Sequence, residues 1–106
     1  MTKNLTVREQ IKKDFGVDLP IIGGSGQSID DPILIDPEYK DWSTVEYSFI
    51  KYANTAQNRN YKVVLTTLLE HNGKQIDQIR IEIEGNSENY YNYYFDVTDH
   101  MPKIKK

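Results

Sequence analysis

Residues 61–84 read YKVVLTTLLEHNGKQIDQIRIEIE, and they carry the clearest structural signal of the chain. Two arms rich in β-branched and aliphatic residues flank the pair Asn72-Gly73. An Asn-Gly pair between two such arms is the strongest short-range signal for a β-hairpin, because both residues tolerate the positive φ angles of a tight turn. The stretch therefore predicts two antiparallel strands that meet at Asn72-Gly73.

The length of the turn sets the register of this hairpin. A two-residue loop would place His71 opposite Lys74. A three-residue loop sorts apolar from polar residues better, through the pairs Leu65–Ile79, Val63–Ile81, Tyr61–Ile83, Lys62–Glu82, Thr66–Gln78 and Glu70–Lys74. We therefore expect the three-residue loop, with Gly73 in the left-handed conformation and with Leu65, Ile79 and Ile81 in the core.

An amphipathic helix is expected near the N-terminus, over residues 6–15. Thr6 and Glu9 have the spacing of a capping box, and Gly16 suits the position just after the helix. One apolar face follows at i, i+4 and i+8, in Val7, Ile11 and Phe15. A helix this short is marginal alone in water, so we expect it to pack on the sheet.

The remaining segments complete an α+β domain. Residues 33–35 read as a short buried strand, and residues 45–54 read as a longer one because Val45, Tyr47 and Phe49 alternate with polar residues. A turn over 85–89 and a strand over 90–98 follow. We expect a single domain over 1–106, with a helix at 6–15, a glycine-rich loop at 18–32, an antiparallel sheet at 33–98 and a frayed basic tail at 99–106. The N-terminal helix would pack on a mostly antiparallel sheet of four to five strands.

The glycine-rich loop reads Leu19-Pro-Ile-Ile-Gly-Gly-Ser-Gly-Gln-Ser-Ile-Asp-Asp-Pro-Ile33. It is either a tight crossing at close backbone approach, a protein-contact loop or a phosphate site, although it lacks the lysine of a P-loop. The segment resembles a Leu-Pro-x-x-Gly-Gly-x-Gly-x-Ser-x-x-Asp stretch in small uncharacterised bacterial proteins, some of which look like immunity proteins of toxin–immunity pairs. That resemblance implies an immunity function and transfers no functional residue.

The charge of the chain is uneven. The formal net charge is −3, and three lysines in the tail leave 10 Lys+Arg against 16 Asp+Glu, or −6, in residues 1–102. An acidic body disfavours nucleic acid and favours either plain solubility or a basic protein partner. The chain has no cysteine, no apolar run typical of a signal peptide and no membrane span, so we expect a cytoplasmic protein.

Residue types that carry catalysis are sparse. The two histidines, His71 and His100, fall at a hairpin tip and near the tail, and no metal-ligand or nucleophile motif is present. The acidic residues after the glycine-rich loop lack EF-hand spacing and read as a solvated segment. We therefore expect no catalytic residue, no cofactor and no metal.

Tyrosine is abundant, with eight residues in 106. Tyr91 and Tyr93 are expected in the core, whereas other tyrosines either support the structure, contact a partner protein or stack on a ligand. The predicted partner-binding residues are Asp30, Asp31, Asp36, Glu38, Asp41, Trp42, Glu46, Tyr52, Tyr90 and Tyr94.

Three functions remain open from the sequence. The first is a non-enzymatic binding protein, most concretely an immunity or inhibitor protein that docks an acidic, Tyr-rich surface on a basic toxin. The second is a small-ligand-binding protein or enzyme with a pocket between helix and sheet. The third is a structural subunit that pairs through its sheet, so the chain is expected to be a monomer or a homodimer.

Overall fold

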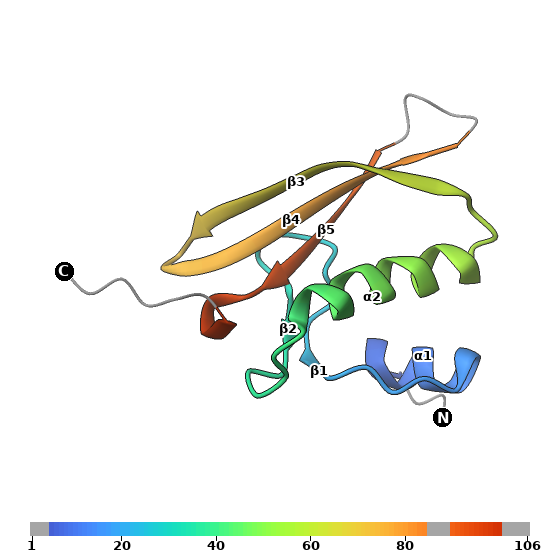
Figure 1. Ribbon diagram of the computed structural model, residues 1–106, viewed down its shortest axis with the longest axis horizontal. Coiled ribbons are helices and arrows are strands. Elements are labelled where there is room, and N and C mark those ends of the chain that lie inside the picture. The colour runs from blue at the N-terminus through green and yellow to red at the C-terminus, as the bar shows by residue number, and fades with distance from the viewer. Residues whose placement is uncertain (1–4, 85–89, 101–106) are drawn as a thin grey trace.

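The computed structural model describes residues 5–84 and 90–100. The elements in chain order are α1 (Val7–Phe15), β1 (Ile21–Gly23), β2 (Ile33–Ile35), α2 (Trp42–Ala56), β3 (Tyr61–His71), β4 (Lys74–Ile83), β5 (Tyr90–Asp96) and a 3-10 turn (Thr98–His100), as Figure 1 shows. The described strands form one sheet in the order β1-β2-β5-β4-β3, and among their pairs only β2–β5 is parallel. The α+β class and the mostly antiparallel sheet are confirmed.

Helix α2 corrects the sequence prediction for residues 45–54, which are helical and not a strand. Its buried residues follow helical spacing, in Val45, Glu46, Phe49, Ile50 and Asn54. Phe49 packs edge-on against Tyr93 and Phe95, with ring centroids 5.9 Å apart in both pairs. Burial of a continuous helical face against the sheet outweighs the short alternation of Val45, Tyr47 and Phe49.

The central hairpin combines both registers that the sequence allowed. Asn72 and Gly73 have φ angles of 52° and 76°, so the loop has two residues in a type I′ turn and His71 faces Lys74. The three-residue loop is therefore wrong, as are the pairs Leu65–Ile79, Thr66–Gln78 and Glu70–Lys74. A β-bulge at Val64 then shifts the register, which makes the expected pairs Tyr61–Ile83, Lys62–Glu82 and Val63–Ile81 correct.

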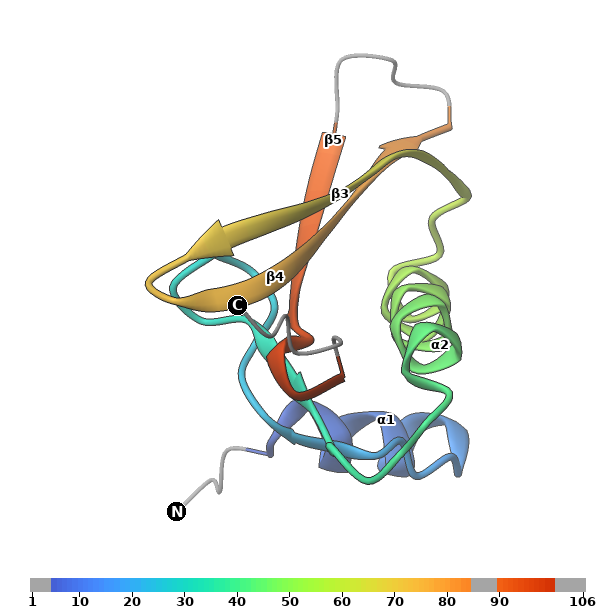
Figure 2. The same cartoon turned by 60° about the vertical axis from the view of Figure 1, so that its left-hand side comes forward.

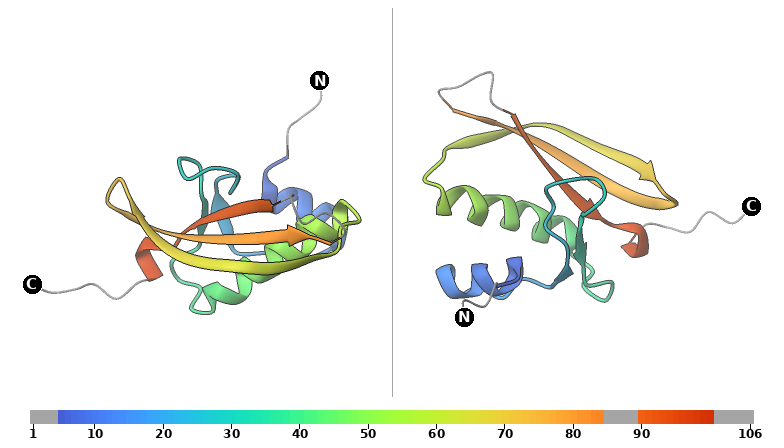
Figure 3. Two further views of the ribbon diagram at one scale, coloured as in Figure 1. Left: turned by 90° about the horizontal axis from the view of Figure 1, so that it is seen from above. Right: turned by 180° about the vertical axis from the view of Figure 1, so that it is seen from behind.

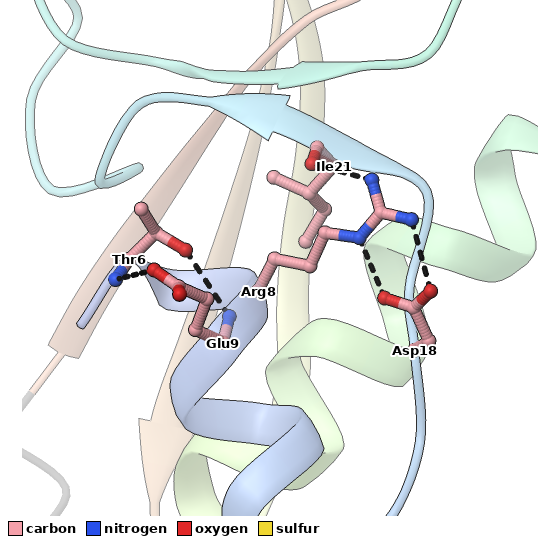
Figure 4. A network of polar contacts seen from close by, with 5 residues as sticks. All are labelled: Thr6, Arg8, Glu9, Asp18 and Ile21. Carbon is pink, nitrogen blue, oxygen red and sulfur yellow. Dashed lines mark hydrogen bonds and ion pairs between the residues drawn. The ribbon is translucent and has the colours of Figure 1, made fainter.

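Helix α1 has the caps that its sequence predicts. The Glu9 N–H donates to the Thr6 side chain and the Thr6 N–H donates to the Glu9 carboxylate, over 3.1 and 3.0 Å (Figure 4). Gly16 closes the helix at φ 71°. Ile11 lies in the core. Three further apolar residues pack against the core: Val7, Phe15 and Val17. The helix itself contacts α2 and the short edge strand β1.

The core lies between α2 and one face of the sheet, with α1 on the far side of α2 from β3 and β4 (Figure 2). Ile33, Ile35, Ile79, Ile81, Phe95 and Val97 are fully buried there. The tip of the β3–β4 hairpin projects past the start of α2, as Figures 1 and 3 show. Leu65 is 40% exposed on this hairpin, so its expected place in the core is wrong, whereas Ile79 and Ile81 are buried as predicted.

Two glycines of the segment 18–32 are required by close packing. A Cβ on Gly24 would lie 1.8 Å from the Pro32 carbonyl oxygen, and one on Gly26 would lie 2.9 Å from the Ile33 side chain. The Gly26 N–H also donates to Asp31, and its carbonyl accepts the Tyr94 N–H. The interpretation as a tight crossing therefore explains why glycine is needed at these two positions. The expected loop also contains one short strand, β1.

Two predicted features lie wholly or mostly outside the described residues. The turn over 85–89 is outside them, as are residues 101–106 of the tail. The start of the expected frayed tail is ordered, because Asp99 and His100 belong to the 3-10 turn. Neither helix in the described part of the chain has the length and apolar character needed to cross a bilayer.

Candidate protein-binding surface

The predicted acidic residues form two separate groups. Asp30 and Asp31 precede β2 and are exposed, whereas Asp36, Glu38 and Asp41 follow β2. The loop before β2 lies on the side of the β3–β4 hairpin, and the loop after β2 lies at the opposite end of the strand (Figure 3). The sequence therefore contains one acidic segment, but the fold divides it into two groups at the two ends of β2.

Glu46 is a correction to the predicted surface, because its side chain is buried. It is 1% exposed, faces Asp77 of β4, and its Oε2 has no hydrogen-bond partner among the described residues. Burial, and then a hydrogen bond with Asp77 and repulsion from it, raise the pKa of the Glu46 carboxyl to about 10. The side chain is therefore protonated at neutral pH and contributes no charge to a docking surface.

Two of the predicted aromatic residues have packing roles. Tyr52 contacts Phe15 between the two helices, with ring centroids 4.8 Å apart. Trp42 contacts His100 of the 3-10 turn at 5.9 Å. Both side chains are half-buried, so only part of each ring is accessible to a partner.

Tyr90 and Tyr94 lie on the sheet face that points away from α2, opposite Glu82 and Gln78 of β4. Polar contacts organise this face. The Asn92 side-chain oxygen accepts hydrogen bonds from Gln78 and Arg80, both over 2.9 Å. Lys62 pairs with Glu82 at 3.2 Å. The face is therefore a polar surface with internal hydrogen bonds, and Tyr90 is 52% exposed at one end of it.

Strand β3 is the surface that sequence reasoning missed. It is the last strand of the sheet, and four of its apolar residues are 38–50% exposed: Val63, Val64, Leu65 and Leu68. Strand β3 has apolar residues on both of its faces, as the neighbours Leu68 and Leu69 show. This pattern differs from that of a strand with one buried and one solvated face, and it could have signalled the exposed apolar surface. Its place at the edge depends on the strand order, which a local pattern does not reveal.

The main-chain groups on the outer side of β3 can be identified. The Gln75 carbonyl accepts the Val97 N–H, so the main chain of Gln75 faces β5. By alternation, Lys74 and its partner His71 face each other across the hairpin. The N–H and C=O groups of Thr66, Leu68 and Glu70 then point away from β4. No strand pairs with them in the described part of the chain.

Acidic side chains lie beside the hairpin end of this edge. The His71 ring contacts the Asp30 carboxylate at 2.8 Å, which holds the loop before β2 against the hairpin. Asp30, Asp31 and Glu70 are all exposed there. We call the outward side of Leu65–His71, together with these three carboxylates, the β3 edge.

A cleft lies beside the other long edge of the sheet. It has a volume of about 590 Å³ and runs between α2, residues 25–27 and the first half of β5. Phe49, Ala53 and Tyr93 form apolar parts of its wall, and Arg59 lies at its rim over the Tyr91 ring, 4.5 Å from the ring centroid. The volume is within the roughly 300–1,000 Å³ of ligand sites.

A hollow of about 380 Å³ lies where the N-terminus of α1 meets Gly23, Gly24 and Ser25. The helix N-terminus is already capped by Thr6 and Glu9. Arg8 donates two hydrogen bonds to Asp18, over 2.6 and 3.0 Å, and these bonds lower the pKa of the Asp18 carboxyl (Figure 4). The helix N-terminus and the Arg8 guanidinium are thus already paired with carboxylates, so a phosphate has little to bind here.

The described residues contain no group of three or more His, Cys, Asp or Glu side chains that could hold a metal ion. The chain matches no protein family, no curated protein and no solved structure.

Proposed function

We propose that this protein is a non-enzymatic protein-binding module, most concretely an immunity or inhibitor protein that neutralises a basic toxin. The observation that carries the proposal is the β3 edge. Native proteins usually blunt an apolar edge strand or cover it, because unpaired N–H and C=O groups attract other strands. An edge left open with exposed Leu65 and Leu68 suits a partner that adds an extended segment to it.

The bulge at Val64 limits where a partner strand can pair. It interrupts regular pairing in the first part of β3, so the regular edge covers Leu65–His71. Seven residues span about 23 Å, which is enough for a strand of typical length. The partner segment would place main-chain groups against Thr66, Leu68 and Glu70.

Charge favours a basic partner. Asp30, Asp31 and Glu70 are exposed at the end of this edge, and the body of the chain is acidic. Opposite charge accelerates association and selects partners. Residues 19–33 resemble a segment of small uncharacterised bacterial proteins, some of which look like immunity proteins, and on that resemblance we propose a toxin as the partner.

The test is capture followed by kinetics. Immobilised protein is used to capture partners from a lysate of the source organism, and the captured protein is then produced alone for binding at two salt concentrations. We expect Leu68→Lys to abolish binding, because it places a charge in the apolar edge. The double reversal Asp30→Lys/Glu70→Lys should slow association and reduce its salt dependence, since it removes the steering charges.

Matched variants decide whether the effect belongs to the β3 edge. The reversal Asp36→Lys/Glu38→Lys changes the net charge equally at the other end of β2 and should slow association less. Full binding by Leu68→Lys would overturn the proposed site. Self-association that Leu68→Lys abolishes, with no other partner captured, would instead identify the chain as a homo-oligomer subunit.

A second candidate function, a ligand-binding protein, is favoured by a separate observation. The cleft beside β5 lies between α2 and the sheet, whereas the pocket expected from the sequence lay between the N-terminal helix and the sheet. Binding there is independent of the β3 edge, because β4 separates the two strands.

A further inference from the structure

Among the described residues, nothing pairs with the edge of the first half of β5 that lies in the cleft. Strand β2 pairs with β5 only at Phe95 and Asp96, and the Gly26 carbonyl accepts the Tyr94 N–H over 3.0 Å. Beyond Tyr94, no described residue continues this side of the sheet. By alternation, the main-chain groups of Asn92 and Tyr90 point to the same side as the Tyr94 N–H, into the cleft.

The walls of the cleft suit a short extended chain. Tyr90–Tyr93 spans about 13 Å at the rise of a β-strand, which corresponds to three or four ligand residues. Phe49, Ala53 and Tyr93 offer apolar contact on the side of α2, while Ser25 and Gln27 offer polar groups on the opposite side. A chain in this position would continue the sheet along the line of β2.

The charge of the cleft differs from that of the whole body. Arg59 is the sole charged side chain among the described residues that line it. Its Nε donates to the Asn54 side chain over 3.1 Å, which fixes the guanidinium over Tyr91. Among the described residues, neither terminal nitrogen of Arg59 takes part in a hydrogen bond, so the fork can bind a carboxylate in bidentate fashion.

We infer that the cleft beside β5 binds an extended acidic peptide, which adds a strand to the main chain of Tyr90 and Asn92 and places a carboxylate on Arg59. Unpaired main-chain groups supply affinity for any extended chain, and the single cation selects an acidic one. The site is distinct from the β3 edge and has the opposite charge preference.

The test uses two synthetic probes, acetyl-Val-Thr-Val-Glu-Glu-amide and acetyl-Val-Thr-Val-Lys-Lys-amide. Amide spectra of the full chain, labelled with 15N, are recorded during titration with each probe. We expect the acidic peptide to shift the Asn92 and Tyr90 amides and to slow exchange of the Asn92 proton with solvent. The basic peptide should bind at least about tenfold more weakly, the factor expected for one charge-assisted hydrogen bond.

Three variants separate the parts of this site. Arg59→Gln should weaken the acidic peptide about tenfold or more, whereas Lys51→Gln, which removes a positive charge from an exposed position on α2, should leave its affinity unchanged. Because Arg59 also holds Asn54, Ala53→Leu gives a second test by filling the cleft without a change of charge. It should block both shifts at Asn92 and Tyr90.

Several results would overturn the inference. Equal binding of the two peptides would contradict the role of Arg59. Shifts confined to Arg59, reproduced by free glutamate, would show a simple carboxylate contact with no added strand. Shifts at Thr66 and Leu68 in place of Asn92 would move the peptide to the β3 edge.

Discussion

Strands β3 and β4 form one hairpin but have opposite environments. Strand β4 lies between two neighbours, and its Ile76, Ile79 and Ile81 are fully buried. Strand β3 has one neighbour among the described strands, and its Val63, Val64, Leu65 and Leu68 are 38–50% exposed. The two strands have similar apolar content, so the difference arises from their place in the sheet. It indicates that β4 stabilises the fold, and it leaves apolar groups of β3 accessible, which is the basis of the proposed partner site.

The largest expected effect tests this division directly. Ile79→Ala should lower the free energy of unfolding by about 2–5 kcal/mol, because it leaves a cavity in the core. Leu65→Ala on the neighbouring strand should cost roughly 1 kcal/mol or less, since much of that side chain is already in solvent. Urea denaturation of both variants gives the comparison. Equal losses would mean that β3 is also part of the core.

The next effect concerns the buried acid beneath β4. The pKa of Glu46 is raised to about 10 in the folded protein from an ordinary value of 4.5. The folded state therefore keeps a proton that the unfolded state releases, and this group lowers stability progressively as pH rises from about 4.5 towards 10.

Glu46→Gln removes that dependence because an amide does not ionise. At pH 7 it should raise the free energy of unfolding by about 1–3 kcal/mol, with the gain growing at higher pH. Unfolding is measured from pH 5 to 9 beside Glu38→Gln, an exposed control. Parallel curves for wild type and Glu46→Gln would refute the protonated state.

The turn that joins the two strands should have a smaller effect. Gly73 has a φ of 76°, so Gly73→Ala introduces a side chain into left-handed backbone and should cost about 1–2 kcal/mol. Gly23→Ala is the control, because a Cβ there has open space and the backbone is ordinary. Thermal melts that do not distinguish the two variants would argue against the type I′ turn.

The smallest expected effect belongs to the ion pair that links β3 to β4. Lys62 is largely exposed, so Lys62→Gln should cost no more than about 0.5 kcal/mol despite its 3.2 Å contact with Glu82. The difference from wild type should vanish in high salt. A larger loss that persists in high salt would show that this end of β3 contributes to stability through packing.

Local signals predicted a large part of the fold. The capping box, the glycine after α1, the position of the Asn-Gly turn and the buried segment Ile33–Ile35 each depend on residues close together in sequence. The prediction of a strand over residues 45–54 is wrong because Val45, Tyr47 and Phe49 alternate as in a strand. Val45, Phe49 and Ile50 also fit one face of a helix. Burial against β5, which is distant in sequence, decides between the two patterns.

The candidate site was harder to predict for the same reason. The bulge at Val64 cannot be inferred from the sequence of the hairpin, because each of the two possible registers pairs some of its apolar residues well. The open edge of β3 depends on which strand pairs with β5, and the burial of Glu46 depends on a helix that was predicted as a strand. Several of the predicted surface residues are exposed, among them Asp30, Asp31, Glu38, Asp41 and Tyr90.

Hydrogen exchange of three amides tests the central claim that β3 offers a free edge to a partner. The N–H groups of Thr66, Leu68 and Glu70 should exchange rapidly in the free protein, while those of Leu65, Thr67 and Leu69, which face β4, should be protected. In complex with the captured partner, the first three should become as protected as the second three. Rapid exchange of Thr66, Leu68 and Glu70 in a saturated complex would contradict the claim.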